Sequence, residues 1–251
     1  MHLLSGGRLR MPRRLYYPDA AADALLEMPV SCALLKHPQG NALFDTGCNP
    51  AAAQDGEARW GGHARCCEPI FDVDASLMGQ LSQTGLSASD IDVVICSHLH
   101  FDHCGCNAYF DRATIICSAK ELDAAQAANA EPMDYIRGEW DVGLPLQAID
   151  GDHDLFGDGR VTLIPLPGHT LGMMGAHVVL DQSGPFVLAS DAVPVGASLH
   201  ERYAPRNTVD VDLYLRSLDE VSRLEQDGAT ILFGHDDVQW NELRQGVQFY
   251  E

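Results

Sequence analysis

The sequence has few basic side chains and no long hydrophobic run. Its 251 residues include 16 lysines and arginines against 36 aspartates and glutamates, which gives a formal net charge of −20. Such a surface repels phosphate backbones and anionic headgroups, so the composition argues against nucleic-acid and membrane partners. No apolar run approaches the roughly 20 residues that a membrane-spanning helix needs. The segment Met1 to Arg8 lacks the apolar core of a signal peptide, which predicts a cytoplasmic protein.

The cysteines show no repeated spacing. Without an export signal, the eight cysteines favour free thiols in a reducing compartment over a disulfide framework. Cys104 and Cys106 lie beside the histidine cluster described next, and they are interpreted as wall residues because histidine and aspartate already supply enough donors. Hydrophobic residues make up 46 % of the chain, and no linker or repeat divides it. Residues 1–251 are therefore expected to form one domain.

A cluster of potential metal ligands follows an apolar run at residues 91–95. Within six positions the sequence places His98, His100, Asp102 and His103. If the strand continues to residue 97, His98 and His100 face the same side and point at one ion, because strand residues two apart share a face. The turn that follows lets the other two side chains reach a second ion. Neutral imidazole and carboxylate suit zinc and related divalent metals, so the cluster predicts a metal site.

Hydrophobic periodicity predicts alternating strands and helices. Strands are expected at residues 1–10, 30–36, 42–44, 91–97, 113–117, 161–166, 176–180, 186–189 and 230–233. Helices are expected at residues 74–83 with Asp74 as N-cap, at 119–130 and at 210–226. The last helix has an apolar stripe of Val211, Tyr214, Leu215, Leu218, Val221 and Leu224. Irregular structure is expected at 11–27, 48–72, 131–158 and 192–208, and residues 48–72 are interpreted as a lid or a dimer surface.

Several predicted strands end in a polar group that can serve a metal site. These groups are Asp45, the pair His98 and His100, His169, Asp191 and His235. Strand ends of one sheet can lie side by side, so these residues are expected to converge. The remaining histidines have no such context and are interpreted as surface or hydrogen-bonded residues: His2, His37, His63, His153, His177 and His200.

Taken together, these motifs resemble the metallo-β-lactamase superfamily, and within it the N-acyl-homoserine lactonase group. The matching stretches are 98–103, Phe44-Asp45-Thr46-Gly47, Pro167-Gly168-His169-Thr170, Glu57 to Gly61, Asp191 and His235. The resemblance implies an α+β fold, an αββα sandwich of two mixed sheets flanked by helices. It also implies two metal ions and a hydroxide that they share. One ion would be held by His98, His100 and His169, the other by Asp102, His103 and His235, with Asp191 bridging them.

One position departs from the lactonase pattern. In that group a tyrosine usually follows the bridging aspartate by three positions and hydrogen-bonds the substrate carbonyl, but this chain has Pro194 there. Proline has no side-chain donor. Either Tyr203, Tyr214 or another group replaces the tyrosine, or the substrate differs.

The function that this resemblance implies is hydrolysis of a lactone, most simply an N-acyl-homoserine lactone as in quorum quenching. A metal-bridging hydroxide attacks the carbonyl, and Asp102 passes the proton to the departing alkoxide. Zinc is the expected metal, with manganese, iron or cobalt as alternatives. Another small lactone, such as pyridoxolactone, or an aryl phosphotriester are alternative substrates. Three other functions fit less well. A thioesterase of this superfamily usually has an extra C-terminal helical domain, which is not expected after His235 in this sequence. A nuclease does not suit the net charge of −20, and a non-catalytic binding protein would be expected to lack one of the metal ligands. A homodimer is possible.

Overall fold

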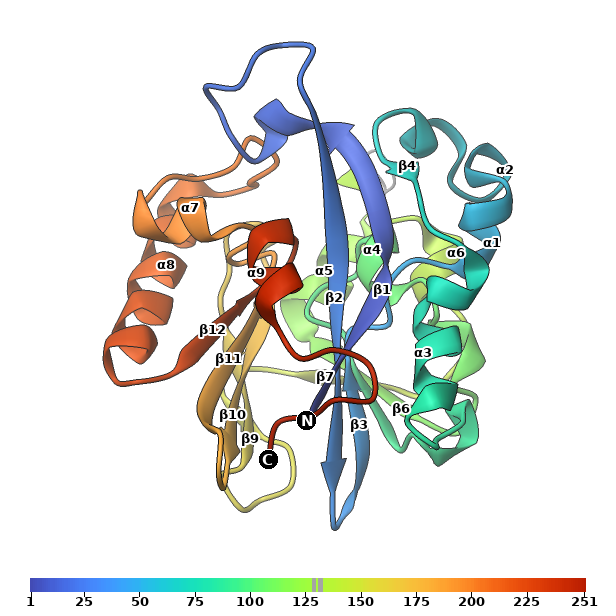
Figure 1. The fold of residues 1–251 in the computed structure, drawn as a ribbon, viewed down its shortest axis with the longest axis vertical. Helices are drawn as coiled ribbons and strands as arrows, with labels where there is room; N and C mark the ends of the chain where they lie inside the picture. Colours follow the sequence, from blue (N-terminus) through green and yellow to red (C-terminus); the bar gives the residue numbers. More distant parts are fainter. Residues whose placement is uncertain (128–129, 131–132) are drawn as a thin grey trace.

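Two β-sheets pack against each other and carry helices on their outer faces (Figure 1). This arrangement is seen in a computed structural model that describes residues 1–127, 130 and 133–251. The first sheet has the strand order β4-β1-β2-β3-β5-β6-β7. Its strands are β1 (His2–Pro12), β2 (Leu25–His37), β3 (Gly40–Phe44), β4 (Glu68–Pro69), β5 (Val93–Ile95), β6 (Thr114–Ser118) and β7 (Leu146–Ile149). Apolar side chains of both sheets, among them Phe44 and Leu163, form the core between them.

The second sheet has the order β12-β11-β10-β9-β8. Its strands are β8 (His153–Asp154), β9 (Val161–Pro165), β10 (Met174–Leu180), β11 (Gly184–Ser190) and β12 (Thr230–Phe233). Both sheets are mixed, because β3, β5, β6 and β7 run parallel in the first, and β11 and β12 run parallel in the second. The predicted αββα sandwich is therefore confirmed.

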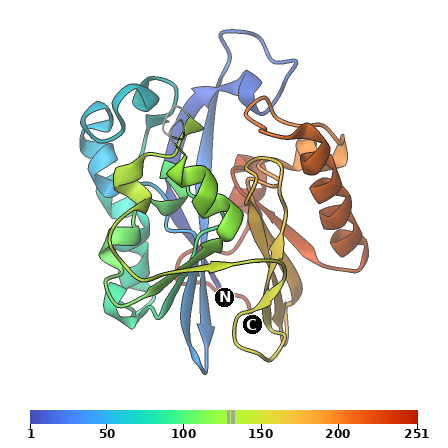
Figure 2. The same ribbon diagram turned by 180° about the vertical axis from the view of Figure 1, so that it is seen from behind.

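Helices cover the outside of each sheet, as the two opposite views show (Figures 1 and 2). The helical elements that position the site are α3 (Leu77–Gln83), α4 (Phe101–Cys104), α5 (Ala119–Gln126), α6 (Arg137–Trp140), α7 (Gly196–His200), α8 (Val211–Gln226) and α9 (Asp237–Glu242). The amphipathic helix α8 begins after the N-cap Asp210, whose side chain accepts a hydrogen bond from Leu213 N–H. It buries Tyr214, Leu218 and Val221 as predicted, but Val211 is 51 % exposed, since it lies in the first turn beyond the sheet. No helix of the described residues is long and apolar enough to cross a bilayer.

The parallel strands bring the polar strand ends to one edge of the molecule. Asp45 follows β3 and the histidine cluster follows β5, and these strands are neighbours in the first sheet. Asp191 follows β11 and His235 follows β12, which are neighbours in the second. The sharp turn after β3 needs glycine at position 47, because its φ is +70° and a Cβ there would lie 2.3 Å from the Cα of Gly6. The turn is thereby pressed against β1.

Three predicted elements are shorter than the sequence suggested. Strand β5 covers Val93–Ile95 rather than 91–97, because the backbone N–H groups of Ser97 and Leu99 bond to carboxylates instead of a neighbouring strand. Helix α3 begins at Leu77 after Ser76, and Asp74, the predicted N-cap, lies in a preceding 3₁₀ turn. Helix α5 ends at Gln126, and residues 128–129 of the predicted helix 119–130 lie outside the described part.

The segments predicted to be irregular contain additional short elements. Residues 48–72 form α1 (Pro50–Gln54), α2 (Gly56–Trp60), a 3₁₀ turn and β4. This segment is fixed to α6 by the buried Glu139, which accepts hydrogen bonds from Arg59 and from Trp60 Nε1. Residues 192–208 contain α7, and 131–158, of which 131–132 lie outside the described part, contain α6, β7 and β8. The N-terminal loop is shorter than predicted and runs from 13 to 24, because β1 and β2 continue as a long antiparallel pair.

Candidate metal centre

Three histidines from two sheets form the first group of ligand atoms. His98 and His100 lie in the loop after β5, and His169 lies in the loop between β9 and β10. Their donor nitrogens all lie within 4.8 Å of one another. The ring centroids of His98 and His100 are 4.5 Å apart, and each lies 5.0 Å from that of His169. The structure thus brings His98 and His100 together, although they lie in a loop and not on a strand.

The second group combines Asp102 and His103 from α4 with His235 after β12. One donor atom from each again lies within 4.8 Å of the others. The two histidines present their Nε2 atoms to each other at 3.3 Å. Asp191 lies between the groups: its Oδ1 is 2.8 Å from His235 Nε2, and its Oδ2 is 3.3 Å from His169 Nε2. All the predicted ligands thus converge, and a further group of His98, His103 and Asp191 within the same distance joins the two.

The donor atoms fit a pair of divalent cations. His98 Nε2 and Asp191 Oδ1 are buried without a hydrogen-bond partner in the described part of the protein. Asp191 Oδ1 also has His235 Nε2 at 2.8 Å, so the argument depends mainly on the unpaired His98 nitrogen. Buried polar atoms are rarely left unpaired, since their desolvation is costly. Imidazole nitrogens and carboxylate oxygens that point at a common centre are the donors that zinc and related metals prefer.

The imidazole rings are oriented by hydrogen bonds on their far side. His103 Nδ1 lies 3.0 Å from Asp45 Oδ2, and His235 Nδ1 donates to the carbonyl of Pro29 at 2.8 Å. Asp45 is itself fixed, because it accepts hydrogen bonds from the N–H and the hydroxyl of Ser97. Such contacts set the tautomer so that the other ring nitrogen can bind a metal. Asp45, which the sequence placed near the site, therefore supports a ligand and is not in a ligand group itself.

A buried glutamate that the sequence analysis missed supports the first group. Glu121, on α5, accepts a hydrogen bond from the N–H of Leu99 at 3.0 Å and from the hydroxyl of Thr170 at 2.7 Å. Leu99 lies between two ligands, and Thr170 follows the third. Burial raises the pKa of Glu121, although these hydrogen bonds oppose the rise. One carboxylate thus connects the two loops that carry the first three histidines.

The two groups differ in their electrostatics. Burial lowers the pKa of His98 and His100 well below the usual value and also lowers that of His169, so these rings stay neutral. Burial acts in the same direction on His103, but Asp102 and Asp191 outweigh it and raise the pKa of this ring well above its usual value. The carboxylates around the second group therefore favour a proton on His103 when no cation is bound.

The tyrosines around the site occupy different environments. Tyr214 is fully buried on α8 and donates a hydrogen bond to Ser198 at 3.4 Å. Tyr203 is half-buried, and its pKa is raised to about 12 by burial and by Tyr17. Tyr16, which the sequence did not single out, is 2 % exposed, and its ring centroid lies 5.8 Å from that of His235. Burial, together with Asp191 and Asp102, raises its pKa well above the usual value, so its hydroxyl stays protonated.

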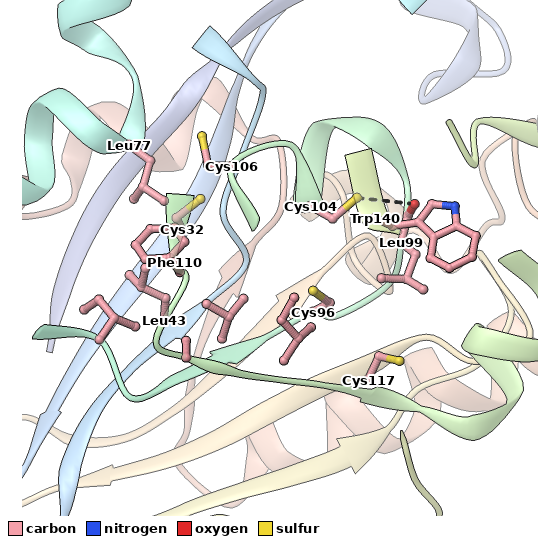
Figure 3. Close-up of a cluster of buried hydrophobic side chains, with 14 of the residues drawn as sticks. Cys32, Leu43, Leu77, Cys96, Leu99, Cys104, Cys106, Phe110, Cys117 and Trp140 are labelled. Atoms are coloured by element: carbon pink, nitrogen blue, oxygen red, sulfur yellow. Dashed lines mark hydrogen bonds between the residues drawn. The ribbon is translucent and has the colours of Figure 1, made fainter. Parts of the chain in front are cut away.

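The cysteines near the cluster are part of the core. Figure 3 shows Cys96, Cys104 and Cys106 among apolar side chains such as Phe110. All eight cysteines are free thiols, as predicted. The Sγ of Cys104 donates to the carbonyl of His100 at 3.1 Å, and burial raises its pKa well above the usual value. Cys104 and Cys106 belong to none of the ligand groups, which agrees with their interpretation as wall residues.

The histidines without a predicted role bond elsewhere or lie away from the ligand groups. His2 Nδ1 lies 3.0 Å from the carbonyl of Gly246, and His37 Nε2 lies 2.9 Å from Asp158. A cavity of about 750 Å³ next to these two residues lies near the chain termini and contains none of the candidate ligands. His63 is nearest to the site, with Nδ1 2.8 Å from Asp134 and its ring 5.7 Å from Phe101.

Known proteins are similar to this chain over nearly its whole length. The N-acyl homoserine lactonase AttM of Azorhizobium caulinodans is 30 % identical, and the alignment covers 100 % of this chain and 98 % of AttM. The N-acyl homoserine lactonase AiiB of Agrobacterium fabrum is 31 % identical, with 92 % and 88 % covered. A solved N-acyl homoserine lactone hydrolase, with the product N-hexanoyl-L-homoserine bound at its catalytic metal centre, superposes with a TM-score of 0.89. It is 26 % identical, and 99 % of this chain and 98 % of that chain are covered.

The family can now be stated from sequence and geometry together. The sequence profile of the metallo-beta-lactamase superfamily matches residues 25–235, a range that begins at β2 and ends on the last candidate ligand. The two facing mixed sheets and the ligand groups at their shared edge are what the sequence resemblance implied. By this match, and by the full-length similarity to AttM, the chain belongs to the metallo-β-lactamase superfamily.

Proposed function

We propose that this protein is a hydrolase that opens the ring of N-acyl homoserine lactones with the help of two divalent cations. The observation that carries the proposal is the position of Asp191 between two buried ligand groups, in a chain that aligns over its full length with N-acyl homoserine lactonases. Destruction of such lactones would quench quorum sensing. All of residues 1–251 are assigned to this one hydrolase domain.

The ligands are assigned as the sequence predicted. His98, His100 and His169 would hold one cation, Asp102, His103 and His235 would hold the other, and Asp191, which lies between the two groups, could serve both. When bound, the cations supply an activated water at neutral pH and polarise the ester carbonyl. Zinc is the metal that we propose, and manganese, iron and cobalt accept the same donors.

Asp102 is assigned the proton transfer. It is the most exposed of the candidate ligands, at 8 %, so it is best placed to meet a substrate. Its Oδ2 faces the second group, 3.5 Å from His103 Nε2 and 3.8 Å from His235 Nε2, which leaves the other oxygen available. The carboxylate takes a proton as water adds to the carbonyl carbon. It then gives this proton to the ring oxygen as the carbon–oxygen bond breaks, and the product is an acyl-homoserine with a free hydroxyl and a carboxylic acid, which releases its proton to the solvent.

The cellular setting is also a proposal. Free thiols are typical of a reducing compartment, so the eight unpaired cysteines support a cytoplasmic location. The acidic composition supports a small-molecule substrate rather than a nucleic acid. A homodimer formed through residues 48–72 stays a prediction.

Turnover of a defined panel tests the proposal. Purified protein loaded with zinc is assayed on homoserine lactones of several acyl lengths, on pyridoxolactone and other lactones, and on an aryl phosphotriester. Ring opening of the homoserine lactones, its loss with a chelator and its return with metal are expected. Preferred turnover of another lactone or of the phosphotriester would assign that substrate instead. Two bound metals without turnover of any of these would refute the proposed activity.

A further inference from the structure

Tyr16 lies beside the second ligand group although it comes from the opposite end of the chain. It directly follows the 3₁₀ turn Arg13–Leu15 in the loop between β1 and β2, which extends beyond the sheet at the top of Figure 1. Its ring packs in one cluster with Phe101, which lies between two ligands, and with Val195, which follows Pro194. The residue thus borders the site on the side of His235.

The main chain on both sides of Tyr16 is fixed. The N–H of Arg206 donates to the carbonyl of Leu15 at 2.8 Å, and its guanidinium donates to the carbonyl of Pro18 at 2.7 Å. The N–H of Arg13 donates to Ala24 across the base of the loop at 2.8 Å. Because the backbone is bonded before and after it, the buried Tyr16 ring keeps one position. A preorganised donor of this kind needs no rearrangement when a substrate binds.

The hydroxyl of Tyr16 retains a proton to donate. Asp191 and Asp102 are the acidic groups that act on it most strongly. Asn207 lies on its other side, and its side chain hydrogen-bonds Tyr16 and lowers the pKa of the phenol, as an amide N–H that donates to the phenol oxygen does. Asn207 Oδ1 is buried and accepts no hydrogen bond from the described residues. The Tyr16 proton is therefore not given to this amide oxygen. Buried tyrosine hydroxyl groups usually find a partner, so a ligand in the site is the natural acceptor.

The other tyrosines near the site are less suitable donors. Tyr214 already donates to Ser198. Tyr17 lies under the guanidinium of Arg13, with 4.3 Å between that group and the ring centroid, and Tyr203 lies beside Tyr17. Pro194, where related lactonases usually have a tyrosine, offers no side-chain donor, and its carbonyl accepts the N–H of His235.

We propose that Tyr16 donates a hydrogen bond to the ester oxygen of the bound lactone that faces His235, and so serves the role that Pro194 cannot. This assignment rests on the proposed lactone hydrolysis. Negative charge grows on both ester oxygens as the ring opens, so the hydrogen bond strengthens in the transition state. Its loss should therefore lower kcat more than it raises KM.

Replacement of the hydroxyl alone tests the assignment. Tyr16→Phe keeps the ring, and Tyr17→Phe is the matched control, since it removes the hydroxyl of the next residue, whose ring lies under the Arg13 guanidinium. Both variants are compared with the unaltered protein at the same metal content and Tm. Tyr16→Phe should then lower kcat on the homoserine lactone by about 10- to 100-fold, whereas Tyr17→Phe should leave kcat within about twofold. Binding of an N-acyl lactam analogue, which keeps the carbonyl acceptor, should be weakened several-fold by Tyr16→Phe in calorimetry.

A donor substitution guards against a purely structural effect. If Tyr16→Phe lowers Tm or metal content, 4-aminophenylalanine at position 16 restores an N–H donor on the same ring and should recover part of kcat. Equal kcat and equal lactam affinity in Tyr16→Phe and Tyr17→Phe would overturn the assignment while lactonase activity stands. If the unaltered protein opens no lactone, the proposed function fails first, and the assignment fails with it.

Discussion

The two ligand groups of the candidate centre are built from similar residues but supported differently. The first is all imidazole, and its backbone is held by the buried Glu121. The second contains Asp102, and its rings are held directly by Asp45 and by the carbonyl of Pro29. Burial keeps the first group neutral, whereas carboxylates raise the pKa of His103 and His235 in the second. Two sites a few ångströms apart can therefore differ in how protons compete with metal.

The residue shared by both groups should have the largest effect. Asp191→Ala removes the oxygen atoms that face His169 on one side and His235 on the other. We expect lactone turnover to fall by at least about 1,000-fold and the metal content to fall below two per chain, because both sites lose a ligand. Turnover kinetics and elemental analysis measure this. Asp181→Ala, at an exposed ion pair with Arg160, should behave as the unaltered protein does, and full metal content in Asp191→Ala would contradict the bridging position.

A change at Glu121 should separate the two groups. Glu121→Gln replaces one acceptor oxygen by an NH₂ group, so either Leu99 N–H or the Thr170 hydroxyl loses its acceptor. We expect metal affinity to fall by about 10- to 100-fold at the first group only, as is typical for groups that orient ligands. A competition titration with a chelator would show one weakened site of two.

Glu139→Gln is the matched control for this experiment. Glu139 is also a buried carboxylate, but it accepts hydrogen bonds from Arg59, Trp60 and Asn49, none of which lies in a loop that carries a candidate ligand. Its replacement should lower Tm and leave both metal affinities unchanged. Equal weakening of both sites in Glu121→Gln would contradict the separate support of the two groups.

Acidification should affect the second group more than the first. The pKa of His103 is raised in the metal-free protein, so this ring carries a proton around neutral pH that a cation must displace. The pKa values of His98 and His100 are lowered, so the first group has no such proton to release. Between pH 8 and pH 6, affinity at one site should therefore fall while the other changes little. Calorimetry in buffers of different ionisation enthalpy measures the proton release directly, and identical pH dependence at both sites would contradict the difference.

The residues of the candidate centre could be identified from the sequence because they follow strands at recognisable turns. His169 and His235 each come after a glycine at a strand end, and the cluster at 98–103 is dense enough to indicate a metal by itself. The end of strand β5 was harder to predict from the sequence. Cys96 N–H still donates to Ile116 in β6, but Asp45 accepts the N–H of Ser97, a contact across 52 positions that no local pattern reveals.

The supporting residues were missed for the same reason. Glu121 lies in the first turn of an alanine-rich helix, where acidic residues are common, and nothing local indicates that it is buried. Its partners are 22 and 49 positions away. Tyr16 lies in a loop with prolines and charges on either side, and only the fold brings it to His235. Local sequence indicates ligands well, but long-range packing decides which other side chains reach them.

The hydrogen bond from His235 to Pro29 spans 206 positions and joins the two sheets. The N–H of Ser31 also bonds to the carbonyl of Gly234 across the same boundary. The second ligand group is therefore complete only when the loop after β12 has docked against β2. Contacts between residues so distant in sequence form slowly. An ion that binds only this assembled state would stabilise it by mass action. During synthesis, metal capture at this group would accordingly report that the chain has been made as far as His235 and that the two sheets have come together.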